Sequence, residues 1–179
     1  MQSAAQLFIM YGVVPASILA GLLDWACHRR TGIAKTSGLP ENLLHLLMFA
    51  QVGLGMLATA LLEINGAVVL AWLAVFVAHE ATVYVDLRYT VSQREVGPFE
   101  QVVHSFLEMV PVLALALSAV IAWPLDDFAP RVKREPWPMA YLLGASAAIV
   151  LFNVIPLLHE TWSCARGVRR RIRPTPGPR

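Results

Sequence analysis

Apolar residues gather in five long stretches that short polar segments separate. The stretches cover residues 6–27, 41–62, 67–87, 99–123 and 137–163. About 20 helical residues cross the roughly 30 Å hydrocarbon core of a bilayer, so each stretch is long enough to cross it once. The pattern predicts an all-α integral membrane bundle of about five transmembrane helices, formed by residues 1–165. The basic segment 166–179 is predicted to be a disordered cytoplasmic tail.

The composition agrees with a chain that lipid surrounds. Of the 179 residues 57% are apolar and 15% are charged, and the mean hydropathy is +0.59; soluble domains carry about 25% charged residues. Two cysteines, Cys27 and Cys164, cannot form a disulfide framework, and we interpret them as packing residues. The N-terminus lacks the basic region of a cleavable signal peptide, so the first stretch is expected to stay as a helix. Three stretches contain a proline that should bend its helix: Pro15, Pro111 and Pro156.

Lysine and arginine residues fall mainly in one set of the predicted loops. Eleven lie on that side: Arg29, Arg30, Lys35, Arg88, Arg94, Arg166, Arg169, Arg170, Arg171, Arg173 and Arg179. The other side holds three, Arg131, Lys133 and Arg134. Because positively charged loops stay in the cytoplasm, this bias predicts an N-terminus outside and a C-terminus in the cytoplasm. We expect a multi-pass protein of a prokaryotic plasma (inner) membrane, whose tail contacts anionic lipid headgroups rather than nucleic acid.

Histidines and acids lie inside or at the edges of the apolar stretches. They are His28, His45, His79, His104 and His159, with Asp24, Glu41, Glu80, Asp86, Glu100, Glu108 and Glu160. An ionisable group at mid-bilayer costs at least about 2.5 kcal/mol for Asp, Lys or Arg, so such a set needs a compensating role. With the N-terminus outside, all of these residues fall in the cytoplasmic leaflet, and we therefore predict one polar site there.

The spacing of these residues brings acids and histidines to common helix faces. Three pairs share the pattern carboxylate-x-x-x-His: Asp24/His28, Glu41/His45 and Glu100/His104. Residues four apart lie on one face of a helix. Each pair can offer an oxygen and an imidazole nitrogen to a metal, or one ligand and the acceptor that orients it. Glu108 extends the last face by one turn, and His79 and Asp86 share a face seven residues apart.

The chain also contains an internal echo. Residues 38–45 resemble residues 97–104, and each run follows a stretch that ends in an aspartate and then an arginine. The echo predicts a duplicated helical hairpin, made of the first and second helices and of the third and fourth, which the fifth helix completes. The match is imperfect, because the aspartate-to-glutamate separation differs, from 24 to 41 in one copy and from 86 to 100 in the other.

Mixed imidazole and carboxylate ligands suit zinc, manganese or iron. The acids outnumber the needs of one four-coordinate zinc, so we predict two divalent metal ions, with iron favoured over zinc or manganese. One ion is assigned to Asp24, His28, Glu41 and His45, and the other to His79, Asp86, Glu100 and His104. Further ligands or bridges are Glu108, His159 and Glu160, and the predicted catalytic residues are Glu108 and Glu80. A purely structural hydrogen-bond network is the alternative.

The predicted function is a membrane-embedded di-metal oxidoreductase, of the non-haem di-iron kind, that acts with O₂ on a lipid, a quinone or another lipophilic substrate. An electron-donor protein is an expected partner. Di-iron carboxylate bundles use a Glu-x-x-His spacing that is absent here, so the likeness is one of analogy. Two alternatives stay open. One is a zinc-dependent lipid hydrolase with Glu108 or Glu80 as general base. The other is a metal-ion or proton transporter, although the opposite leaflet has few polar residues to continue a path.

Overall fold

The computed structural model describes residues 3–172, with side chains to residue 168, as five long helical segments and no strands. The helices are α1 (Ala4–Phe8), α2 (Val14–Thr31), α3 (Leu39–Leu61), α4 (Gly66–Thr90), α5 (Pro98–Ala122), α6 (Met139–Ile149) and α7 (Ile155–Ile172). A π-helical turn joins α1 to α2, and another joins α6 to α7, so each pair is one continuous segment. All five segments are long and apolar enough to cross a membrane. The all-α architecture with five membrane-length helices is therefore confirmed for the described residues.

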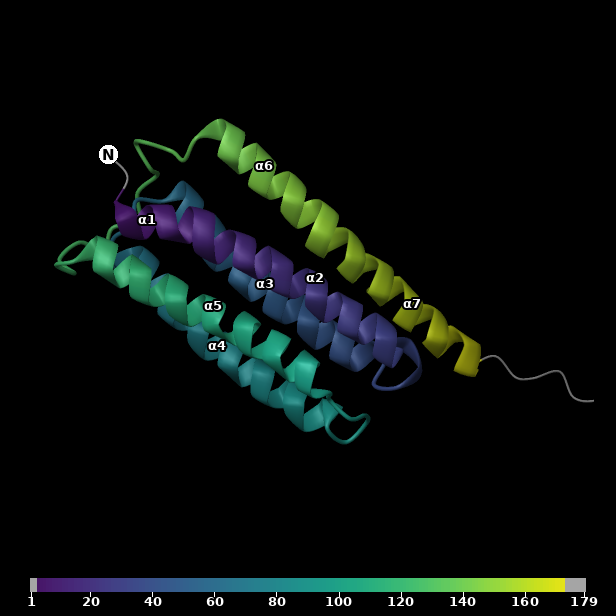
Figure 1. The fold of residues 1–179 in the computed structure, drawn as a ribbon. Coiled ribbons are helices and arrows are strands. Elements are labelled where there is room, and N and C mark those ends of the chain that lie inside the picture. The colour runs from purple at the N-terminus through teal and green to yellow at the C-terminus, as the bar shows by residue number, and fades with distance from the viewer. Residues whose placement is uncertain (1–2, 173–179) are drawn as a thin grey trace, which may run out of the picture.

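The five segments form a ring. Helix α3 packs against α4, α4 against α5, and α5 against α2, while α7 packs against both α2 and α3 (Figure 1). Helices α2 and α3 are consecutive in sequence, but they face each other across the ring and share few backbone contacts. The hairpin of α4 and α5 is thus a packed pair, whereas the first two segments are not. The predicted duplication is not shown by this arrangement.

The first and last segments share an unusual local structure. A π-helical turn spans Ile9–Val13 and precedes Pro15, and a second spans Val150–Val154 and precedes Pro156. Both prolines end the same five-residue pattern. It consists of an aromatic residue, any residue, a valine, then valine or isoleucine, and finally proline. A proline lacks the N–H donor and crowds the carbonyl one turn earlier, and the wider π turn relieves that crowding. These two prolines therefore do not break their helices.

The two ends of the bundle differ in character. One end, which we call the loop end, contains the turn at 62–65 and the connection 123–138, and the two pair through an antiparallel bridge between Leu62 and Val132. Asn65 caps α4 there by accepting a hydrogen bond from the Ala67 amide at 3.0 Å. The other end, which we call the site end, contains the connections 32–38 and 91–97.

Helix α7 runs further than the sequence predicts. It continues to Ile172, so the first part of the segment 166–179, which we expected to be disordered, is helical. Two contacts favour this extension. The Arg166 guanidinium lies 3.4 Å from the centre of the Trp162 ring, and Gly167 packs so closely on the connection 32–38 that its Cβ position is 3.0 Å from the Ala34 carbonyl oxygen. Residues 173–179 lie outside the described part of the chain.

Candidate metal centre

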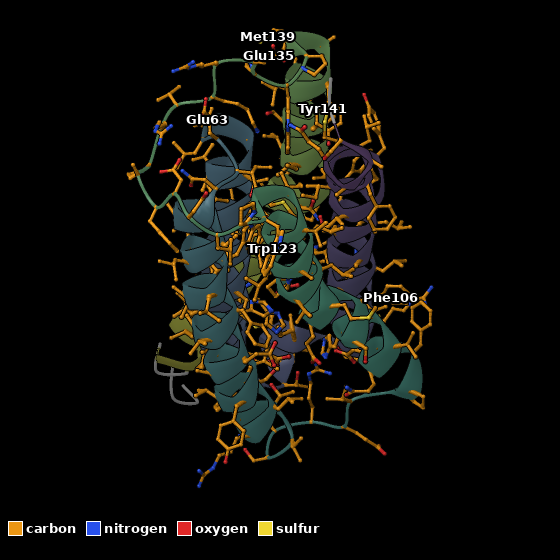
Figure 2. All side chains as sticks on the ribbon, turned by 90° about the vertical axis from the view of Figure 1, so that its left-hand side faces the viewer. Glu63, Phe106, Trp123, Glu135, Met139 and Tyr141 are labelled. Atoms are coloured by element: carbon orange, nitrogen blue, oxygen red, sulfur yellow. The ribbon has the colours of Figure 1, made fainter. Side chains whose placement is uncertain are left out.

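All five segments bring imidazole or carboxylate side chains to the site end. The residues are Asp24 and His28 of α2, Glu41 and His45 of α3, Asp86 of α4, Glu100 and His104 of α5, and Glu160 of α7. Most of these side chains are buried, and Asp24 and His104 are partly buried. His79 lies about two turns deeper on α4, at the level where Gln51 of α3 contacts Ala78 and Thr82. Figure 2 shows nitrogen and oxygen atoms gathered between the helices, away from the loop end that Glu63 and Glu135 mark. The carboxylate-x-x-x-His faces thus point into the ring.

His28 lies at the middle of the cluster. Its Nε2 is 3.4 Å from Glu100 Oε1 and 3.5 Å from Asp24 Oδ1, and 3.8 Å separates it from Glu41 Oε1. Its Nδ1 is 3.4 Å from Glu160 Oε2. One buried imidazole is therefore surrounded by carboxylates from four helices.

Two further histidines complete the centre. His104 Nε2 lies 2.9 Å from Asp24 Oδ1, and His45 Nε2 lies 3.3 Å from Asp86 Oδ2. The His45 ring stacks on the His28 ring, with centroids 4.5 Å apart and an interplanar angle of 19°. Helices α2 and α3, which face each other across the ring, therefore meet through these two imidazoles.

Two overlapping groups of side chains can hold a metal ion. They are Asp24 with His28 and His45, and His28 with Glu100 and His104. In each group one donor atom per residue lies within 4.8 Å of the others, whereas metal–ligand bonds of about 2.0–2.2 Å require donors to stand somewhat closer. The grouping differs from the predicted division into one ion per hairpin, because both groups use His28. Ring order rather than chain order decides which ligands are neighbours.

Arg94 joins the cluster from the connection 91–97. Its Nη2 lies 2.6 Å from Glu41 Oε1 and 2.6 Å from Glu100 Oε1. Its Nη1 donates to Glu100 Oε2 at 3.0 Å, and its Nε donates to Glu41 Oε2 at 3.3 Å. Burial alone would lower the pKa of the guanidinium, but these hydrogen bonds outweigh burial and raise the pKa above its ordinary value. We call the three residues the arginine clamp.

Sequence reasoning did not find two members of this centre. It treated Arg94 only as a cytoplasmic charge, and it gave no role to Asn42, whose Nδ2 donates to Glu160 Oε1 at 3.0 Å. The sequence contains a feature that could have indicated each of them. Arg94 is a lone arginine between two acid-bearing helices, and Asn42 is a polar residue next to Glu41, at the start of a membrane-length span.

Some predicted ligands lie apart from the centre. His159 is exposed and packs near the Trp162 ring, with centroids 6.4 Å apart, while Glu160 points inward. Neighbouring helical positions are about 100° apart, so only one of the two can face the ring. Glu80 is partly exposed, and Glu108 is partly buried beside the central cavity.

Several buried polar atoms of the centre have no hydrogen-bond partner among the described residues. They are His28 Nε2, Asn42 Oδ1, His45 Nδ1 and Asp86 Oδ1, and both ring nitrogens of His79, in the wall of the adjoining cavity, also lack a partner. Buried polar groups in proteins are nearly always paired, so such a concentration indicates a ligand or solvent. Five carboxylates (Asp24, Glu41, Asp86, Glu100 and Glu160) and one guanidinium leave a formal charge of −4 when the imidazoles are neutral. The donor set and this charge both fit divalent cations.

A cavity of about 620 Å³ adjoins the centre inside the ring. At the site end its wall includes His28, His45 and His104, and toward the loop end the wall is almost wholly apolar and reaches Trp137. Trp137 is buried against Ile9 and Met10 and closes that end of the bundle. The molecule thus combines a polar cluster with an apolar chamber of the size of small-molecule sites.

Comparison of the chain with protein-family models, with curated proteins and with solved structures finds no match. The chemistry of the centre and the shape of the cavity therefore carry the functional argument.

Proposed function

We propose that this chain is a membrane-embedded di-metal oxidoreductase that acts on a lipophilic substrate, with non-haem iron as the favoured metal. One observation carries the proposal. A buried cluster of imidazoles and carboxylates lies at the end of an apolar cavity inside membrane-length helices, and several of its nitrogen and oxygen atoms have no hydrogen-bond partner among the described residues. A purely structural network would be expected to pair those atoms with one another.

Two ions suit the centre better than one. The formal charge of −4 is balanced by two divalent cations, and the two candidate groups adjoin at His28. Asp24, His45, Glu100 and His104 would supply the remaining ligands. Carboxylate and imidazole ligands are those of non-haem iron sites that use oxygen. Anionic ligands also favour the higher oxidation states that such chemistry needs.

The substrate and redox partner follow from the surroundings of the centre. An apolar molecule can reach the cavity from the bilayer without crossing water. Oxygen chemistry consumes electrons, so the proposal includes a donor protein that docks at the site end, where the connections 32–38 and 91–97 cover the cluster. The cytoplasmic side is the expected location of that donor, as the positive-inside bias predicts.

Elemental analysis of the purified chain in detergent tests the proposal. We expect two irons per chain in the wild type. Asp24→Asn and His104→Ala should each lose at least half of the metal, because both residues lie in the candidate groups. Glu63→Gln is the matched control, since Glu63 lies at the loop end within 3.9 Å of Arg134 and far from the cluster. A folded wild type without bound metal, or variants that keep all of it, would refute the proposal.

A second function is favoured by the position of Glu108. This carboxylate lines the cavity one helical turn beyond His104 and is in neither candidate metal group. A carboxylate beside a metal-bound water is the arrangement that zinc hydrolases use for general-base catalysis. In that case the chain would hold zinc and cleave a lipid. Glu108→Gln would then keep the zinc and lose hydrolysis, whereas two redox-active irons would exclude this function.

A further inference from the structure

The cavity opens sideways between α3 and α6. Phe49, Gly53, Leu57 and Leu61 lie four residues apart on one face of α3, and all of them line the cavity while being exposed. Ser146 of α6 also lines it and is exposed. Helix α6 packs against α2 rather than α3, so the two walls are not joined. We call the gap lined by these five residues the lateral opening. It lies within segments that can span a membrane.

The cavity is long enough for an extended hydrocarbon tail. Along α3 its wall extends from His45 to Leu61, which is about 24 Å at 1.5 Å per helical residue. A volume of about 620 Å³ over that length leaves room for a tail along the apolar wall.

His79 provides a polar contact in the wall of this chamber. Its side chain is 4% exposed and lines the cavity, and both ring nitrogens lack a hydrogen-bond partner among the described residues. It is in neither candidate metal group. A neutral imidazole has one donor and one acceptor, which matches a hydroxyl group.

We propose that the lateral opening admits a lipid with a hydroxyl head group, and that His79 binds this head group in the wall of the cavity. The tail then lies along the apolar wall of α3 and reaches toward Trp137. This inference rests on the proposed function and names its substrate class and route of entry. Its test needs no turnover, so its failure can be told apart from a failure of the proposed function.

A photoreactive long-chain alcohol tests the route. Hexadecanol with a diazirine at the far end of its tail is added to the full-length chain in bilayer nanodiscs, and the cross-linked residues are mapped by mass spectrometry. We expect cross-links near Trp137 at the loop end of the cavity. Cross-links confined to the outer surface of the bundle would overturn entry of the alcohol into the cavity.

Two glycines give a matched pair of variants. No atom lies within 4 Å of the Cβ position at Gly53, so a side chain there begins in open space, and we expect Gly53→Phe to fill the lateral opening. The same holds at Gly144 of α6, but Gly144 lines a separate groove between α2 and α6. Gly53→Phe should reduce cross-linking at least tenfold, and Gly144→Phe should leave it unchanged. An unaffected Gly53→Phe protein, shown to be monodisperse and to hold wild-type metal, would refute entry between α3 and α6.

The role of His79 has its own readout. His79→Phe keeps an aromatic ring of similar size and removes both hydrogen-bonding atoms. It should weaken hexadecanol binding about tenfold, the effect of one lost hydrogen bond to a buried group, and leave hexadecane binding unchanged. Equal losses for the alcohol and the alkane would show that His79 only shapes the wall. The metal content of the same preparation, measured in parallel, shows whether the centre itself is intact.

Discussion

Replacing Arg94 by glutamine removes the cation of the arginine clamp. In the wild type the guanidinium donates to Glu41 and Glu100 together, with Nη2 at 2.6 Å from an oxygen of each. The Arg94 and Glu100 side chains are each 4% exposed and Glu41 is fully buried. Glutamine is shorter and uncharged, so it leaves two buried carboxylates that face each other across the former position of the guanidinium.

The size of the effect follows from the burial of the three groups. Removing one partner of a buried ion pair costs about 3–5 kcal/mol, because the remaining charge keeps its desolvation penalty without its attraction. Arg94→Gln should therefore lower the free energy of unfolding of the metal-free protein by about that amount. Divalent cations should offset the loss, since the variant centre is one unit more negative. Metal-loaded Arg94→Gln should thus regain most of its stability.

Unfolding by sodium dodecyl sulfate in mixed micelles, with chelator and with added metal, measures both states. Arg131→Gln is the control, since its pair with Asp127 at 2.6 Å is solvent-exposed and worth at most about 1 kcal/mol. If the metal-free Arg94→Gln protein is no less stable than Arg131→Gln, the clamp does not hold the site end together. A variant that is destabilised and gains nothing from metal would show that the Glu41 and Glu100 carboxylates do not face the metal centre.

Three other measurements probe the rest of the bundle. Burial lowers the pKa of Lys133 to about 8, so the rate at which an acylating reagent modifies its amine should rise through a midpoint near pH 8 as the amine loses its proton. A midpoint near pH 10.5 would contradict the partial burial of Lys133 at the loop end. Gly55→Ala should cost about 1–3 kcal/mol by overpacking, because the new Cβ would lie 2.8 Å from the Trp72 ring. Gly53→Ala meets no atom within 4 Å and should change stability little, so equal effects would disprove this packing argument. A reporter at the C-terminus should indicate the cytoplasm and one inserted in 123–138 the outside, and finding both on one side would refute the five-helix topology.

The helices and the inward faces could be predicted because both depend on local spacing. Stretch length sets the number of membrane-length helices, and the four-residue spacing sets which side chains share a face. The ends of the helices were predicted less accurately. Helix α2 continues to Thr31, four residues past the predicted end of the first apolar stretch at residue 27. Polar residues such as Arg29 and Arg30 continue the backbone hydrogen bonding of the helix beyond the apolar stretch. Hydropathy measures only how apolar the side chains are, so it does not indicate where a helix with polar end residues stops.

The grouping of the candidate ligands could not be predicted, because it depends on the order of helices in the ring. A hairpin model places Asp24 with residues of the next helix, yet its shortest contact is with His104, 80 positions along the chain. Arg94 was missed for the same reason, since it reaches Glu41 only after α3 and α5 have come together. His159 shows the converse error. Its residue type suggested a ligand, but the helix phase that points Glu160 inward turns His159 toward the outside.

The same ring explains how a sealed polar site and an open apolar chamber can share one bundle. Asn153, within the second π-helical turn, donates from Nδ2 to the Ile18 carbonyl oxygen at 3.1 Å. Its amide occupies the position that a Cβ of Gly21 would need, so α2 and the last segment approach closely at that level. From there α7 continues beside α3 and closes the site end, while α6 continues beside α2 and leaves α3 uncovered. A side chain at Gly21 would displace the Asn153 amide and break its hydrogen bond to Ile18, so the closed end and the lateral opening diverge from a level where α2 is tied to the last segment by this one contact.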